Sequence, residues 1–309
     1  MKSNNICKKS LIMKPYLLLF LSVLFLLCAC ERDELTGSGS GLEINVGDKV
    51  VLTANEIDYY DLSTHFIYLK GSNSFINEKL VRDSFQIYAN GKRIYNGVFH
   101  SWVMSSMPLG PAIYTPSLFY EDYLIPITYG SYVNQAGEKV PKVNPRNDPR
   151  LISALKSWNQ LHDGLRCEIR SVQFNTSGKV SLELQLINKD SFNYYYLDPE
   201  KMGLGLFHYF TNGLSFWSPT LKKSFDNHIE HIQPDPWDSW EMNWLSLIRS
   251  GETKTINIQY TNFDPLTAGD YKLYFRFPGL GRVEKSKLIQ QNGRVWLGEL
   301  DMSQDITLR

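Results

Sequence analysis

Apolar and polar side chains alternate along several segments in the second half of the chain. Residues 180–187 place Val, Leu, Leu and Leu at every second position, with Ser, Glu and Gln between them. Segments 255–260 and 271–277 have the same period of two. Because successive side chains of a strand point to opposite faces, this period predicts half-buried strands of an antiparallel sheet.

The first half of the chain is also rich in strand signals, with less regular alternation. Its strongest turn signal is Asn90-Gly91, which lies between two apolar segments. A two-residue type I′ turn needs positive φ at both central residues, and Asn-Gly tolerates this best, so we expect a β-hairpin here. The candidate strands of this half are 49–53, 65–69, 85–88, 93–99 and 123–129.

One segment has the helical period instead. Asp148 and Pro149 supply an N-cap and a proline at the first helical position. Apolar residues then recur at helical spacing from Leu151 to Leu161. This pattern predicts one clear helix near 149–161, followed by a domain boundary near residue 165.

The first 29 residues have the pattern of a secretory signal peptide. The apolar run 16–27 spans only about 18 Å as a helix, which is short for a hydrocarbon core of ~30 Å. Lysines precede it, as in a signal peptide. Either Met1 or Met13 can be the start, because both leave a complete signal. A permanent signal anchor is the alternative, which the shortness of the run disfavours.

The end of this segment, Leu27-Cys28-Ala29-Cys30, resembles a bacterial lipobox. In that family the last cysteine becomes the new N-terminus and carries the lipid, so the resemblance implies lipid attachment at Cys30. The acid-rich residues 31–34 resemble the surface-export signal of Bacteroidota lipoproteins, with a plain solvated tether as the alternative. Residues 30–41 are therefore expected to be a flexible, partly Gly/Ser-rich tether. The expected location is the outer membrane, with cell-surface exposure if the export signal operates.

Removal of residues 1–29 leaves 28 basic and 32 acidic residues, a formal charge of −4. Such a charge does not favour nucleic acid as a partner. Cys167 is the only other cysteine that remains besides Cys30, which excludes a disulfide within the folded part. Cys167 lies in a strand-like run, so we expect a buried, unreactive side chain.

The C-terminal part has Asn188 at the end of one strand, Gly251-Glu252-Thr253 before another, and Gly269-Asp270-Tyr271 at the start of a third. This arrangement resembles an immunoglobulin-like or fibronectin-type β-sandwich and, more weakly, the bacterial intracellular proteinase-inhibitor (BsuPI) domain. The resemblance covers about 166–277 and implies a fold rather than an activity. No inhibitory residue is carried over.

The expected fold is therefore mainly β, with two antiparallel β domains. These domains are 42–165, which ends in the helix, and 166–309, an Ig-like sandwich. An insert at 188–249 is unusually aromatic and includes Phe216-Trp217. Its aromatic side chains suit either the core or a partner surface.

The main candidate binding surface is a group of tryptophans and acids within that insert. Its members are Trp237, Trp240, Trp244, Asp235 and Asp238. Aromatic rings stack on sugar faces and carboxylates accept hydrogen bonds from hydroxyl groups, so the group suits a carbohydrate. Two carboxylates at a suitable separation would also suit glycoside hydrolysis. The alternative is that the tryptophans pack in the core while the acids face water.

Other chemistry has little support in the sequence. His228 and His231 form the only close histidine pair, and a zinc site would need a third ligand. No nucleophile elbow, P-loop or dinucleotide fingerprint is present. We therefore expect no metal, no cofactor and no enzymatic activity. The chain is predicted to be a lipid-anchored binding module for protein or glycan; the alternatives are a surface hydrolase of glycans or peptides and a proteinase-inhibitor-like module.

Overall fold

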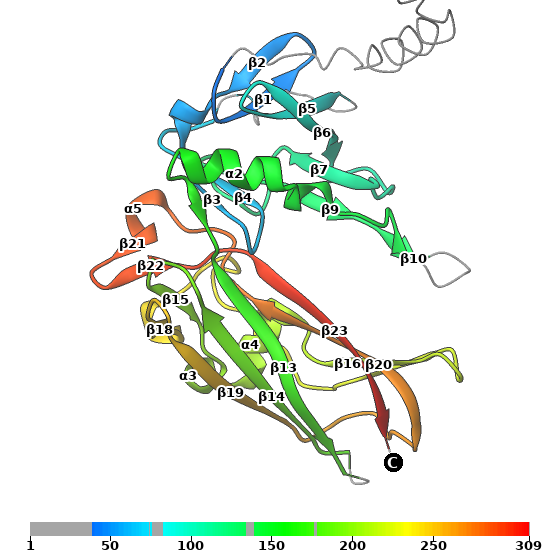
Figure 1. Ribbon diagram of the computed structural model, residues 1–309. Coiled ribbons are helices and arrows are strands. Elements are labelled where there is room, and N and C mark those ends of the chain that lie inside the picture. The colour runs from blue at the N-terminus through cyan, green and yellow to red at the C-terminus, as the bar shows by residue number, and fades with distance from the viewer. Residues whose placement is uncertain (1–38, 74, 76–82, 134–138, 176–177, 309) are drawn as a thin grey trace, which may run out of the picture. The chain divides into compact units, whose positions relative to one another are not determined.

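The computed structural model describes residues 39–308, except 74, 76–82, 134–138 and 176–177 (Figure 1). The predicted signal peptide, Cys30 and most of the tether lie outside the described residues. Gly37–Arg309 is one compact unit. Strands dominate the described residues, which confirms the mainly β fold.

Two sheets form most of the N-terminal half, which also has a small two-stranded sheet. The larger has the strand order β2-β1-β5-β6-β7-β9 and the smaller β12-β3-β4-β8. Apolar side chains from both sheets pack into one core that includes Ile44, Tyr60 and Phe85. The strands are β1 (Leu42–Val46), β2 (Lys49–Leu52), β3 (Ile57–Asp61), β4 (Phe66–Leu69), β5 (Ser84–Ala89), β6 (Lys92–Ser101), β7 (Gly110–Thr115), β8 (Leu124–Pro126), β9 (Thr128–Gly130) and β12 (Leu161–His162).

The predicted hairpin at Asn90-Gly91 is confirmed. It joins β5 to β6, and both turn residues have positive φ, 50° and 77°. Beyond this hairpin the sheet is not purely antiparallel, because β6 pairs with β7 in parallel. The remaining short elements of this half are β10 (Tyr132–Val133), β11 (Lys139–Val140), and the 3₁₀ turns η1 (Ala54–Glu56) and η3 (Pro145–Asn147).

The predicted helix is present as α2 (Pro149–Ser157) and is shorter than expected. Asp148 caps it, since its side chain accepts a hydrogen bond from the backbone N–H of Arg150 at 2.8 Å. The helix ends early because Asn159 adopts a left-handed backbone with φ 53°. The next residues instead form β12, which pairs in parallel with β3.

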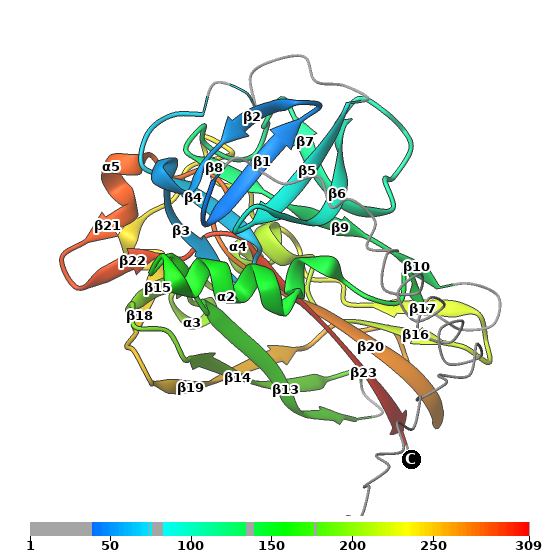
Figure 2. The same ribbon diagram turned by 45° about the horizontal axis from the view of Figure 1, so that its top comes forward.

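Three sheets form the C-terminal half, with the strand orders β13-β14-β19, β18-β15-β22-β21 and β17-β16-β20-β23. In both views β20 and β23 lie side by side as an antiparallel pair, and β23 leads to the C-terminus (Figure 2). The strands are β13 (Leu165–Phe174), β14 (Val180–Asn188), β15 (Tyr194–Leu197), β16 (Ser215–Ser218), β17 (Lys223–Asp226), β18 (Leu245–Ile248), β19 (Thr253–Tyr260), β20 (Gly269–Pro278), β21 (Ile289–Gln290), β22 (Gly293–Val295) and β23 (Glu299–Leu308). The helical elements are α3 (Pro199–Met202), α4 (Leu204–Thr211), η4 (Met242–Trp244) and α5 (Lys285–Leu288).

The period-two segments form strands with the expected inward faces. Along β14, Val180, Leu182, Leu184 and Leu186 are all buried, while the residues between them are half-buried. The alternating residues of β19 and β20 also point into the core. Local alternation therefore identified both the strands and their buried faces.

The Ig-like sandwich predicted for 166–309 is not confirmed. Its strands are divided among three small sheets, and β15 pairs with β22 in parallel. The physical reason lies in the insert 188–249, which supplies β15 to β18 and the helices α3 and α4. Phe207 of α4 is fully buried in the same core as the strands, so the insert forms part of the core.

The two halves pack against each other through apolar and polar contacts. The larger core includes Tyr59, Tyr68 and Leu124 from the N-terminal half. Arg294 lies over the rings of Phe192, at 3.9 Å, and Tyr59, at 4.8 Å. The domain boundary near residue 165 stays a prediction, because the two halves share this core within a single compact unit.

Candidate functional site

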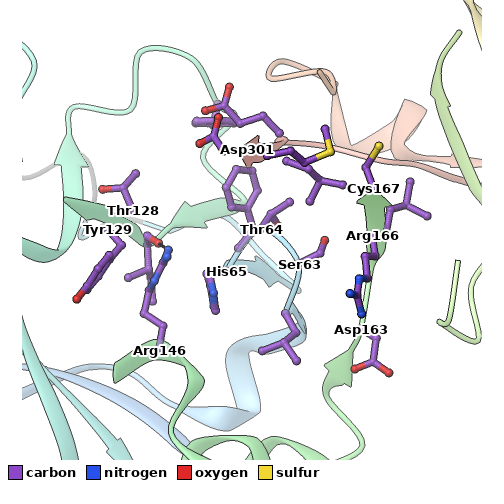
Figure 3. Close-up of a pocket in the computed structure, with 18 residues that line it drawn as sticks. Ser63, Thr64, His65, Thr128, Tyr129, Arg146, Asp163, Arg166, Cys167 and Asp301 are labelled. Carbon is purple, nitrogen blue, oxygen red and sulfur yellow. Dashed lines mark hydrogen bonds between the residues drawn. The ribbon is translucent and has the colours of Figure 1, made fainter. Parts of the chain in front are cut away.

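A cavity of about 620 Å³ lies where the two halves meet. One wall comes from the β3–β4 turn, β9 and η3, and the other from the start of β13 and from β23. Figure 3 shows Arg146 and Asp301 entering it from different sides. The volume is in the range of small-molecule sites. We refer to this cavity as the cleft.

Arg146 is the most distinctive group of the cleft. Its Nε donates to Asn144 Oδ1 at 3.0 Å, Nη1 donates to the carbonyl of Ile127, and the guanidinium lies 5.3 Å above the ring of Tyr129. Among the described residues it has no carboxylate partner, and Nη2 makes no hydrogen bond. Burial lowers its pKa from the ordinary 12.5. A half-buried guanidinium held in this way offers a fixed positive charge to an anion.

Two neighbouring residues of the β3–β4 turn add polar groups to the same wall. His65 is buried and hydrogen-bonds to the hydroxyl of Tyr60 through Nδ1, at 2.8 Å. Burial, helped by the charge of Arg146, lowers the pKa of His65 to about 3, so the ring is neutral at physiological pH. Thr64 Oγ1 is buried and has no partner within the described part of the chain. Buried polar groups normally have a hydrogen-bond partner, so this hydroxyl is an exception beside the cleft.

The facing wall is acidic. Glu299 and Asp301, at the start of β23, both bind Arg276, at 3.1 and 2.8 Å. Burial and the neighbouring Asp301 raise the pKa of Glu299, while Arg276 acts in the opposite direction. Positive and negative groups are therefore separated across the cleft, which favours a ligand with distinct anionic and hydrogen-donating parts.

Asp61 shapes the turn behind this site. Its Oδ1 accepts hydrogen bonds from the backbone N–H of Ser63 at 2.8 Å and from the Ser63 hydroxyl at 2.6 Å. Gly164 packs directly against both groups, and a Cβ there would lie 2.3 Å from Asp61 Oδ1. The turn that carries Thr64 and His65 is thus fixed by a buried carboxylate and a close glycine.

A second buried carboxylate, Asp190, ties the segments on either side of β13 and β14 together. It accepts from His162 Nδ1 at 2.7 Å, Gly164 N at 3.0 Å and the Tyr194 hydroxyl at 2.8 Å. Burial would raise the pKa of Asp190, but these hydrogen bonds and His162 outweigh it and hold the pKa below its usual value. The contact between His162 and Asp190 joins the residues just before β13 to those just after β14.

Cys167 also lines the cleft, and the structure agrees with the expected inert thiol. Its side chain is buried, and this burial raises its pKa to about 12. The thiolate, which is the reactive form, is therefore scarce at neutral pH.

The predicted tryptophan surface is spread over different environments. Trp237 is exposed, at 47%, and lies 5.9 Å from the guanidinium of Arg282, which also pairs with Asp238 at 3.2 Å. Trp240 packs partly against the larger core, and Trp244 is half-buried with its ring 6.3 Å from Phe210. Asp235 is exposed. No ring pair joins the three tryptophans within the part of the chain described here, so they do not form one stacking platform.

The histidine pair His228 and His231 does not form a metal site in the described part of the chain either. His228 Nε2 lies 2.9 Å from Asp264 Oδ1, and the side chain is half exposed. Within the described ranges, no three His, Cys, Asp or Glu side chains are grouped as a metal site would require. No described helix is long and apolar enough to cross a bilayer.

The residues of the cleft were missed by the sequence analysis. Arg146, Thr64 and His65 come from short turns with no motif of their own, and only the docking of the two halves brings them together. The sequence offers one indirect signal for Arg146, because Asn144-Pro145 directly before it is typical of the start of a turn. No protein-family model and no curated protein matches this chain.

Proposed function

We propose that this chain is an exported, lipid-anchored, non-enzymatic binding protein of the outer membrane, exposed at the cell surface. Its cleft binds a carboxylate group presented by a glycan or protein ligand. The observation that carries the proposal is the fixed guanidinium of Arg146, which has no carboxylate partner among the described residues.

The chemistry of the cleft supports a carboxylate ligand. Arg146 retains Nη2 donors, and Thr64 of the same cleft has a buried hydroxyl with no partner among the described residues. Charge-assisted bonds from arginine to carboxylate are among the stronger hydrogen bonds in proteins. The acidic wall formed by Glu299 and Asp301 suits hydroxyl or amino groups elsewhere on the same ligand.

The hydrolase and proteinase-inhibitor alternatives are not favoured by any specific observation. In the cleft His65 is bonded to Tyr60 rather than to a nucleophile, and its lowered pKa makes it a poor base. The carboxylates of Glu299 and Asp301 both pair with Arg276, so neither is a free acid or nucleophile.

Binding of glucuronate and of short peptides with a free C-terminus tests the proposed cleft. Calorimetry on the wild type should detect binding, and Arg146→Met should weaken it at least tenfold. Arg166→Met is the matched control, because Arg166 also lines the cleft but already pairs with Glu168 at 2.9 Å. If neither probe binds, or if Arg146→Met binds as well as the wild type, the proposed cleft function is wrong.

The anchor has its own test. Cys30→Ala should abolish metabolic labelling with fatty acid and should release the protein from the membrane fraction. Labelling that persists in this variant would overturn the lipid attachment at Cys30, whatever the outcome for the cleft.

A further inference from the structure

Two exposed aromatic side chains lie on the outer face of the β17-β16-β20-β23 sheet. Trp217 on β16 and Tyr274 on β20 are both exposed there, at 37% and 42%. Trp217 is paired in register with Lys272, and Tyr274 follows Lys272 by two positions on the same face. The two rings are therefore diagonal neighbours on adjacent strands.

Polar groups with unused bonding capacity surround these rings. Lys272 Nζ lies 5.7 Å from the Tyr274 ring, and Asp305 is paired in register with Lys272 on the next strand. Neither side chain has an ion pair or a hydrogen bond among the described residues. Beside them Thr307 donates to Asp270 at 2.7 Å. Exposed aromatic rings flanked by hydrogen-bond donors and acceptors are the chemistry that sugar rings require.

The surface is hollowed and elongated. One cavity of about 520 Å³ is lined by Trp217, Lys272, Tyr274 and Asp305. A second, of about 450 Å³, adjoins it at Tyr274 and extends to Arg276 and Asp301. We call the two together the sheet groove. Asp301 also lines the cleft, so the sheet groove leads along β23 into it.

The length of the groove indicates a chain-like ligand. Asp301, Asp305 and Thr307 lie on one face of β23, and the seven residues from Asp301 to Thr307 span about 20 Å. A site of this length with rings at intervals is suited to an oligosaccharide rather than to a single sugar.

We infer that the sheet groove binds an oligosaccharide whose sugar rings stack on Trp217 and Tyr274. Lys272 and Asp305 bind the hydroxyl groups of the oligosaccharide. The oligosaccharide is expected to extend toward the cleft and to place an acidic sugar at Arg146, and this part rests on the proposed function. The stacking site at Trp217 is independent of it.

The test is a glycan array carrying neutral and uronic-acid-containing oligosaccharides, probed with the full chain in detergent, followed by titration of the glycans retained. Trp217→Ala and Tyr274→Ala should each weaken binding of neutral and acidic glycans at least tenfold. Trp237→Ala is the matched control: this tryptophan is also exposed but lies outside the sheet groove, so it should change binding less than twofold. Melting temperatures identify any variant that fails to fold.

The results separate this site from the cleft. If Arg146→Met weakens only acidic glycans while Trp217→Ala weakens both kinds, both sites are supported. If Trp217→Ala alone has an effect, the sheet groove stands and the cleft proposal fails. If no glycan is retained, or if the folded Trp217→Ala and Tyr274→Ala variants bind like the wild type, the sheet groove is not a glycan site. Should Trp217→Ala also fail to fold, Lys272→Met at the exposed edge gives the same comparison.

Discussion

The hydroxyl of Ser63 lies 2.6 Å from Oδ1 of Asp61, while Oδ2 of the same carboxylate is buried and has no partner among the described residues. Asp61 is fully buried, and this burial raises its pKa from 3.8 to about 6. The carboxylate thus holds the turn of the cleft in place while its charge is poorly compensated.

Asp61→Asn is therefore expected to stabilise the protein above pH 6. An acid whose pKa is raised in the folded state contributes stability at low pH, and this contribution is lost as the pH rises from about 4 to 6. A rise from 3.8 to about 6 corresponds to at most about 3 kcal/mol. Asparagine keeps an oxygen acceptor for the Ser63 N–H. Urea unfolding at pH 7.5 and pH 4 measures the difference; a variant that is equally destabilised at both pH values would contradict the argument.

His65 should affect the pH dependence of stability in the opposite direction to Asp61. Its pKa falls from 6.5 to about 3 on folding, so the unfolded chain binds a proton that the folded chain does not. The contribution to stability is therefore present above pH 6.5 and is lost as the pH falls toward 3. His65→Asn tolerates the left-handed backbone of this position, φ 58°. The slope of unfolding free energy against pH between 4 and 6 should decrease by about 1.4 kcal/mol per pH unit; an unchanged slope would show that His65 takes up no proton on unfolding.

Gly164→Ala should destabilise the fold strongly. The new Cβ would lie 2.3 Å from Asp61 Oδ1 and from Ser63 Oγ, in a backbone with φ 69°. Gly251→Ala is the matched control, because Gly251 has a similar φ of 74° but open space around it. The control should cost only the backbone strain, roughly 1–2 kcal/mol, and Gly164→Ala should cost distinctly more. Equal losses in chemical denaturation would show that the cleft turn adapts to the methyl group.

Two tryptophans should differ in their effect on stability. Trp296 is buried, at 1% exposed, in the larger core, so Trp296→Ala should cost ~3–5 kcal/mol. Trp237 is 47% exposed, and its replacement by alanine should cost less than about 1 kcal/mol. Thermal melts of both variants test this. A large loss at Trp237 would mean that its contact with Arg282 stabilises the loop.

Local patterns predicted many of the elements correctly. Alternation identified β14, β19 and β20 with their buried faces, Asn90-Gly91 identified a hairpin, and Asp148-Pro149 identified the start of α2. Each of these signals is carried by residues close together in the chain, so no knowledge of distant contacts was needed. The lipid anchor at Cys30 is also a local prediction, and it lies outside the described residues.

The association of these elements could not be predicted in the same way. The parallel pairing of β6 with β7 and the core position of Phe207 depend on contacts between distant segments, and both depart from the expected sandwich. The exposure of Trp217 and the burial of Trp296 were equally undetermined, because an aromatic residue in a strand suits either face until the neighbouring sheet is known.

By itself, the sequence determined the mainly β character, the principal period-two strands and the start of the helix at Pro149. Hydrophobic period and helix capping act over a few residues, so they can be recognised without the tertiary structure. Only the tertiary structure decided where the chemistry gathers. Arg146 from η3, Thr64 from a β-turn and Asp301 from β23 meet in one cavity because two halves of the chain pack together. That packing is driven by the burial of Tyr59, Tyr68 and Leu124, a sum of many weak apolar contacts between residues far apart in the chain that no short motif encodes.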